Sequence, residues 1–262
     1  MTTLNQKLSN QQVQSYKDMG YLVVPDLLTS TEINTFLQNE EKPNKKRLGL
    51  RTHVVDPQWA YLAHHPKVSA YAAQLLETKP MIVQTMYLPK APLSELDSAS
   101  PGVALHQDTL YIPNEPNTLM ACWLALDDTS SENGGLCIVA NSHQSGLKKA
   151  HHNQNTDEHV SWVQTYDMSS PDGKKWSEEL CSFEMDDLEQ MDIKHLSVPA
   201  GGGVFFTGLT IHGSYANLSP SKYRRAFAIH YVGQGTWVYR SDIQELVEVN
   251  LQITEDENHQ TS

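Results

Sequence analysis

A histidine and an aspartate lie one residue apart in the apolar run from Ala104 to Tyr111. If this run is a β-strand, His106 and Asp108 point to the same face, because alternate side chains of a strand share a side. An imidazole and a carboxylate are common metal ligands, although a His-x-Asp pair alone often occurs by chance. The pair therefore predicts a metal site if a third ligand joins it in the fold.

A third candidate ligand, His212, ends an apolar segment expected to be a strand and is followed by Gly213 and Ser214. Two histidines and one carboxylate form the facial triad of non-haem Fe(II) oxygenases, which leaves open positions on the iron. Zinc accepts the same ligand types, so a zinc-dependent hydrolase or isomerase on a cupin-like barrel is a second hypothesis. A non-catalytic barrel that only binds a small molecule is a third.

An arginine in segment 223–232 separates these hypotheses. The segment alternates as a strand would, which places Arg224 on one face together with two small alanines that leave space beside it. A guanidinium in such a pocket can bind a carboxylate through two hydrogen bonds, which suits the distal carboxylate of 2-oxoglutarate. Arg224 is preferred over Arg225, which lies on the opposite face. His230 shares the inward face, and a core histidine is favoured over a role beside the metal.

The elements that must position these residues follow from the spacing of apolar side chains. Apolar residues recur at helical spacing in the first part of the chain, and their period then changes to two. We expect a helical N-terminal part at about 1–80 and a β-rich core at about 81–235. In the helical part, Gly20 ends the first helix, and Thr29 with Glu32 forms a capping box that opens the second.

Many short apolar runs bounded by turn signals indicate a barrel or a sandwich. Segment 147–195 is different, because it is acidic and polar with scattered aromatic residues; we interpret it as an insertion that leaves the sheet and could cover the mouth of a site. We expect the whole chain, 1–262, to be a single domain. The expected strands are 21–24, 81–88, 104–111, 118–126, 135–140, 203–206, 209–212 and 224–232, and a third helix spans 68–76.

The overall charge limits the partners. The formal net charge is −12 and the isoelectric point is about 5.4, which opposes binding to nucleic acid or anionic lipid. No run approaches the roughly 18 apolar residues of a membrane helix, so a cytoplasmic protein with a small-molecule substrate is the expectation. Lys90 and the basic connection 42–51 could attract an anionic substrate, but solvated loops are the preferred interpretation. Nothing in the sequence indicates the oligomeric state.

These residues together resemble the phytanoyl-CoA dioxygenase (PhyH) family from about Gly20 to Val232. The resemblance covers most of the chain rather than one motif, and its motifs come in the family's order. They are Gly20-Tyr21-Leu22-Val23-Val24-Pro25, Thr85-Met86, Lys90-Ala91-Pro92, His106-Gln107-Asp108 with Tyr111 and Pro113, Ala121-Cys122-Trp123, Asn133-Gly134-Gly135-Leu136, Ser142-His143, His212-Gly213-Ser214 and Asn217.

The resemblance implies a mostly β fold with flanking α-helices, in which a double-stranded β-helix (a jelly-roll, cupin-like core) follows N-terminal helices. It also implies Fe(II) on His106, Asp108 and His212. The 2-oxoglutarate contacts that it implies come from Arg224, Ser214, Trp123 and Met86. Gln84 lies on the same strand face as Met86 and could hydrogen-bond the co-substrate or the substrate.

The implied reaction consumes O2 and 2-oxoglutarate, releases succinate and CO2, and hydroxylates an aliphatic carbon of a small-molecule substrate. Because Asp108 fills the carboxylate position of the triad, no ligand position is left for chloride, so hydroxylation is expected rather than halogenation. Members of the family act on unrelated substrates, so the resemblance does not supply the substrate.

Overall fold

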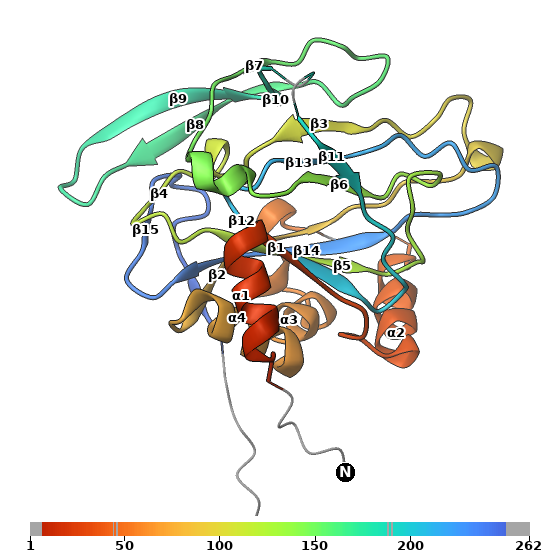
Figure 1. Ribbon diagram of the computed structural model, residues 1–262, viewed down its shortest axis with the longest axis horizontal. Helices are drawn as coiled ribbons and strands as arrows, with labels where there is room; N and C mark the ends of the chain where they lie inside the picture. The colour runs from red at the N-terminus through yellow and green to blue at the C-terminus, as the bar shows by residue number, and fades with distance from the viewer. Residues whose placement is uncertain (1–6, 44, 46, 188, 190, 250–262) are drawn as a thin grey trace, which may run out of the picture.

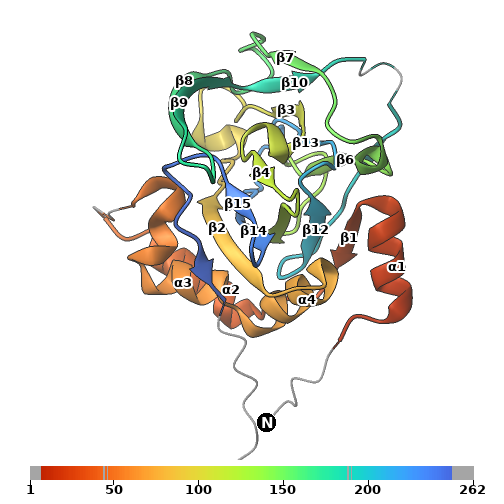
Figure 2. The same cartoon turned by 90° about the vertical axis from the view of Figure 1, so that its left-hand side faces the viewer.

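The computed structural model describes residues 7–249 except residues 44, 46, 188 and 190. In Figure 1 the molecule is layered, with helices below, a large antiparallel sheet above them, a smaller sheet above that, and the two-stranded pairs β8–β9 and β7–β10 on top. Figure 2 shows the same order of layers from the side. The fold is the predicted one, mostly β with flanking helices around a jelly-roll core.

The helical layer comes from the N-terminal part of the chain. Both predicted signals are present: Gly20 ends the first helix in the left-handed conformation (φ 79°), and Thr29 with Glu32 forms the capping box of the second. A short helix after Asp56, which caps it, was not predicted. No helix of the described ranges is long and apolar enough to cross a membrane. The helices are α1 (Asn10–Met19), α2 (Ser30–Glu40), α3 (Pro57–Ala63) and α4 (Pro66–Leu76), with a 3-10 helix at Gly49–Val54.

The large sheet has six strands in the order β1-β12-β5-β14-β2-β16, and every neighbouring pair is antiparallel. Its strands are β1 (Tyr21–Val24), β2 (Pro80–Tyr87), β5 (Met120–Ala125), β12 (Gly203–Thr207), β14 (Ala226–Gly233) and β16 (Val247–Glu248).

The small sheet has four strands in the order β11-β6-β13-β3, again antiparallel. Its strands are β3 (Val103–His106), β6 (Leu136–Val139), β11 (Ile193–His195) and β13 (His212–Ser214). Sequence order and spatial order differ in both sheets, as in a double-stranded β-helix, where successive strands alternate between two facing sheets.

Alternation along β14 divides the core in two. Phe227, Ile229 and Tyr231 pack against the helices, whereas Ala226 and Ala228 face the small sheet. All five side chains are buried. The face with the small side chains is therefore the one that looks into the space between the sheets, as the sequence pattern predicts.

Two predicted strands have different ends in the structure. Strand 104–111 stops at His106, and Asp108 begins a 3-10 turn that runs to Leu110. Strand 209–212 is a turn closed by a hydrogen bond from the Thr210 N–H to the Thr207 carbonyl oxygen (2.9 Å), so His212 starts β13 instead of ending a strand. The period of apolar residues cannot distinguish a buried turn from a strand in so short a segment.

Segment 147–195 is only partly outside the sheets. It forms two antiparallel pairs, β8 with β9 and β7 with β10, which lie above the two main sheets in Figure 1, and β10 packs against β3 of the small sheet. Its last strand, β11, joins the small sheet beside β6, so the prediction that the whole segment leaves the sheet is wrong for residues 193–195. The strands outside the two main sheets are β4 (Asn114–Glu115), β7 (Ala150–His152), β8 (Val163–Ser169), β9 (Lys175–Cys181), β10 (Phe183–Met185) and β15 (Trp237–Val238).

Candidate active site

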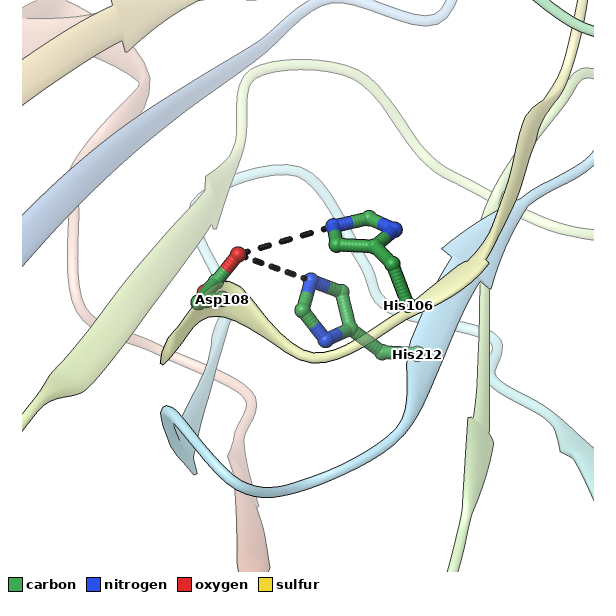
Figure 3. A group of neighbouring side chains, drawn as sticks. All are labelled: His106, Asp108 and His212. Carbon is green, nitrogen blue, oxygen red and sulfur yellow. Dashed lines mark ion pairs between the residues drawn. The ribbon is translucent and has the colours of Figure 1, made fainter. Parts of the chain in front are cut away.

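The three predicted metal ligands lie together at one end of the small sheet. His106 ends β3, His212 begins the adjacent strand β13, and the two residues are partners in the ladder. Asp108 Oδ1 lies 3.5 Å from Nε2 of His106 and 3.6 Å from Nε2 of His212 (Figure 3). All three side chains are buried, and their ligand atoms lie within 4.8 Å of one another. This spacing allows one ion to contact all three.

Backbone carbonyls set the orientation of both imidazoles. Nδ1 of His106 lies 2.8 Å from the Ala104 carbonyl oxygen, and Nδ1 of His212 lies 3.0 Å from that of Thr210. A carbonyl oxygen only accepts, so each Nδ1 carries a proton and each Nε2 presents its lone pair to the aspartate side. Burial lowers the pKa of His212 to about 4, so this imidazole stays neutral at neutral pH. Neutral imidazoles are the form that binds a metal.

The second carboxylate oxygen of Asp108 has a partner on the other sheet. His230, on β14, lies with Nε2 3.1 Å from Asp108 Oδ2, and its Nδ1 lies 3.4 Å from Nε2 of Gln84 on β2. Burial alone would raise the pKa of Asp108, but the nearby His212 and His230 imidazoles and the hydrogen bond from His230 lower it well below its usual range. The carboxylate is therefore ionised, with one oxygen left for a metal.

Gln107, between the two ligands, anchors the turn that follows β3. Its side chain is fully buried; Nε2 donates to the carbonyl oxygens of Leu209 (2.6 Å) and Gly146 (3.0 Å), and Oε1 accepts from the N–H of Lys148 (2.8 Å). These bonds tie the chain between His106 and Asp108 to two neighbouring loops. The ligands converge because of this anchored turn, and not because they alternate on one strand.

A cavity of about 390 Å³ opens beside the three ligands, within the size range of small-molecule sites. Four of the five predicted co-substrate contacts line it, namely Met86, Trp123, Ser214 and Arg224. The fifth, Gln84, is not among the lining residues and contacts His230 and the Met86 sulfur, so the prediction of direct contact with a ligand is not supported by its position.

The two adjacent arginines have different environments. Arg225 is bidentate to Asp127, with Nε and a terminal nitrogen 2.9 Å and 2.7 Å from its two oxygens, on the side away from the cavity. Arg224 is 3% exposed and donates to the Leu88 carbonyl oxygen at 2.8 Å, while its Nε has no hydrogen-bond partner. Burial lowers the pKa of Arg224 to about 10, so its guanidinium remains charged at neutral pH. A buried charge with a free donor is suited to an anionic ligand.

Lys90 is buried, contrary to the interpretation of this region as a solvated loop. Its side chain lines the same cavity, and Nζ donates to Ser214 Oγ at 2.9 Å and to the Tyr215 carbonyl oxygen. Arg51 and Arg47, from the basic connection, instead contact protein groups such as Glu40 and do not line this cavity. His230, expected as a core residue, is buried but directly contacts Asp108.

The outer walls of the cavity come from segments that carried no sequence signal. Ser100 and Pro101 precede β3, Val103 is its first residue, and Val160 comes from segment 147–195. Their residue types are ordinary for loops, and only the folded arrangement brings them to the mouth. The histidines given no metal role, His64, His65, His143, His151 and His152, lie outside the one group of potential metal ligands in the described part of the chain.

The comparisons with known proteins agree with the fold. The family model for phytanoyl-CoA dioxygenase (PhyH) matches residues 38–226, which is most of the chain. Phytanoyl-CoA dioxygenase of Arabidopsis thaliana is 27% identical over 80% of this chain and 67% of its own length. The phytanoyl-CoA dioxygenase domain-containing protein 1 of Danio rerio is 27% identical over 82% of this chain and 61% of its length.

Solved structures confirm the architecture. The epimerase SnoN, in complex with Fe3+, alpha ketoglutarate and nogalamycin RO, superposes with a TM-score of 0.67 at 20% identity, covering 88% of this chain and 86% of that one. The fold therefore defines a jelly-roll protein of the type found in non-haem, alpha-ketoglutarate-dependent enzymes. The chain belongs to the phytanoyl-CoA dioxygenase family, so the resemblance seen in the sequence is confirmed.

Proposed function

We propose that this chain is an Fe(II)- and 2-oxoglutarate-dependent dioxygenase, with iron held by His106, Asp108 and His212. The observation that carries the proposal is a buried two-histidine, one-carboxylate group that faces a cavity lined by an arginine with no carboxylate partner among the described residues. Such a triad leaves coordination positions open for a bidentate keto acid and O2. Arg224 and Ser214 supply donors for the distal carboxylate.

When bound, iron and 2-oxoglutarate supply an oxidation by O2 that releases succinate and CO2. The chain contributes orientation: the Ala104 and Thr210 carbonyls hold the imidazoles, and His230 holds the second oxygen of Asp108. Trp123 and Met86 form apolar walls that exclude water from the co-substrate. Gln84 contributes indirectly, because it contacts His230, which in turn contacts Asp108.

Hydroxylation of an aliphatic carbon is the outcome we propose for the substrate. A carboxylate at position 108 leaves no ligand position for a halide. The relatives' names mention phytanoyl-CoA, and that compound is one candidate; a cytoplasmic location stays a prediction. The chain spans 60–67% of the length of the first curated relatives, whose whole-protein activities are not transferred with the fold.

The alternatives are a zinc-dependent hydrolase or isomerase and a non-catalytic binding barrel. Either could use the three ligands, since zinc accepts the same donors. Neither accounts for the buried, unpaired Arg224 at the side of the cavity.

The test is anaerobic binding of Fe(II) and then 2-oxoglutarate, followed by succinate release in air. We expect a visible charge-transfer band when the keto acid chelates iron. His106→Ala should abolish iron binding. Arg224→Gln should weaken the binding of 2-oxoglutarate by about 10- to 100-fold without changing the affinity for iron. Arg225→Gln is the matched control, because it removes the adjacent guanidinium that pairs with Asp127. The proposal fails if 2-oxoglutarate does not bind and zinc alone supports activity.

A further inference from the structure

We propose that Lys90 is a second cation of the co-substrate pocket and binds the distal carboxylate of 2-oxoglutarate together with Arg224 and Ser214. The inference rests on the function proposed above, since it concerns the same co-substrate. It makes Lys90 a specificity-determining residue that selects dicarboxylate keto acids over monocarboxylate ones.

Lys90 and Arg224 are two basic side chains with no acidic partner of their own. They are 6% and 3% exposed, and both line the cavity beside the proposed iron ligands. Within the described residues, neither forms an ion pair with a carboxylate, whereas the neighbouring Arg225 does so with Asp127. Burying an unpaired charge is strongly unfavourable. A cavity lined by a buried guanidinium and a buried amine is therefore suited to an anion that enters from outside.

The backbone holds the two cations side by side. The Lys90 N–H donates to the Arg224 carbonyl oxygen (2.8 Å), and the Arg224 N–H donates to that of Lys90 (3.0 Å). Asn217 Nδ2 donates to the same Lys90 oxygen at 3.1 Å. Side chains of residues directly opposite in an antiparallel bridge project to the same side. Both cationic side chains therefore reach the same end of the cavity.

The Lys90 ammonium points to the hydroxyl that we assign to the distal carboxylate. Nζ donates to Ser214 Oγ at 2.9 Å and to the Tyr215 carbonyl oxygen. An ammonium has three donors, so one N–H remains. Because Ser214 also lines the cavity, that remaining donor lies next to the site at which Arg224 and Ser214 would hold a carboxylate.

The charge state of Lys90 makes it responsive to such a ligand. Burial, and after it the charge of Arg224, lowers the pKa of Lys90 to about 6; Cys137, the other titratable group beside it, opposes this. A carboxylate bound between the two cations favours the protonated amine, which takes its proton from solvent. A keto acid without a distal carboxylate gains nothing from Lys90.

The experiment compares two keto acids on the anaerobic Fe(II)-loaded protein by calorimetry. One is 2-oxoglutarate, and the other is 2-oxopentanoate, which has a methyl group in place of the distal carboxylate. Lys90→Met should weaken the binding of 2-oxoglutarate by about 10- to 100-fold and change the affinity for 2-oxopentanoate by less than about twofold. Lys222→Met is the control, because Lys222 is an exposed lysine paired with Glu132, and it should change neither affinity.

Lys90→Gln provides a second variant in case Lys90→Met does not fold, because glutamine keeps an N–H donor for Ser214. It should show the same loss of preference for 2-oxoglutarate. If either folded variant weakens both keto acids in parallel, or weakens neither, the inference is overturned and Lys90 has a structural role only. If the unaltered protein itself does not prefer 2-oxoglutarate over 2-oxopentanoate, the proposed function fails, which is a different result.

Discussion

At the scale of single residues, the two oxygens of Asp108 have separate tasks. Oδ1 faces His106 and His212, and Oδ2 is held by His230 from the other sheet. A carboxylate restrained in this way does not need to rotate when a metal binds. Partners that orient a metal ligand typically change metal affinity by about 10- to 100-fold when they are removed.

His230→Phe should therefore weaken Fe(II) binding by about 10- to 100-fold while the protein remains folded. His230→Gln should lose less Fe(II) affinity, because the glutamine amide can still donate a hydrogen bond to Asp108 Oδ2. Metal titration under anaerobic conditions measures both, with His151→Gln on the outer strand β7 as the control. An unchanged iron affinity in His230→Phe would mean that Asp108 is positioned by its turn alone.

At the scale of elements, the close approach of β13 to β3 depends on a glycine between His212 and Ser214. A Cβ on Gly213 would lie 2.6 Å from the Val103 carbonyl oxygen and 3.2 Å from two Ala104 backbone atoms. Backbone cannot move aside as a side chain tip can. Any larger residue would push apart the two strands that carry the histidine ligands.

Gly213→Ala should lower the free energy of unfolding by about 1–3 kcal/mol and also weaken iron binding. Gly235→Ala is the comparison, since no atom lies within 4 Å of its Cβ position and the cost there is confined to its positive φ. It should reduce stability without changing iron affinity. Chemical denaturation and metal titration on both variants distinguish the two effects.

Glu32, in the capping box of α2, should make the free energy of unfolding depend on pH in the acidic range. Burial alone would raise the pKa of Glu32, but hydrogen bonds from Tyr61 and Thr29 and the nearby His65 lower it to about 2 from 4.5. The folded state thus binds this proton more weakly than the unfolded state. The contribution is complete above pH 4.5 and is lost as the pH falls towards 2. The free energy of unfolding, measured by chemical denaturation across this pH range, should fall less steeply with decreasing pH in Glu32→Gln than in the unaltered protein.

The sequence predicts some elements well and others poorly, for physical reasons. The alternation in segment 223–232 correctly predicts an inward face, because β14 is buried on both sides and its small residues mark the cavity. The end of β3 is not predictable from periodicity, since the turn at Asp108 depends on the distant bonds of Gln107. The burial of Lys90 is also not predictable, because a lysine in a proline-containing segment is expected to be exposed. Only the fold places Ser214 beside it.

At the scale of the whole molecule, segment 147–195 is attached to the site through aromatic rings. The ring of Trp162 lies 5.7 Å from that of Tyr111, which lies 5.3 Å from both His106 and Phe183. The Phe183 N–H donates to the Tyr111 hydroxyl at 2.8 Å. The layer formed by segment 147–195, of which Val160 lines the cavity, is thus held in place by contacts with the turn that carries a proposed ligand.

Trp162→Ala should loosen this layer without altering the iron ligands. Each aromatic pair contributes about 0.5–1.5 kcal/mol, so amide hydrogen exchange around residues 153–163 should become up to about tenfold faster. Affinities for Fe(II) and 2-oxoglutarate should stay within about twofold of the original. Exchange measured by mass spectrometry tests the first point. A large loss of iron affinity would show that the layer also determines the metal geometry.

Two of the proposed iron ligands, His106 and His212, belong to the small sheet, and Asp108 begins the turn after β3. Arg224, Trp123 and Met86 belong to the large sheet or its end. At the cavity mouth, Ser100, Pro101 and Val160 belong to neither sheet. Three properties of the enzyme are thus encoded in three separate parts of the chain. Mutations at the mouth can accumulate by drift while metal and co-substrate remain under selection. Descendants of one ancestor could in this way acquire new substrates in small steps without passing through an inactive intermediate.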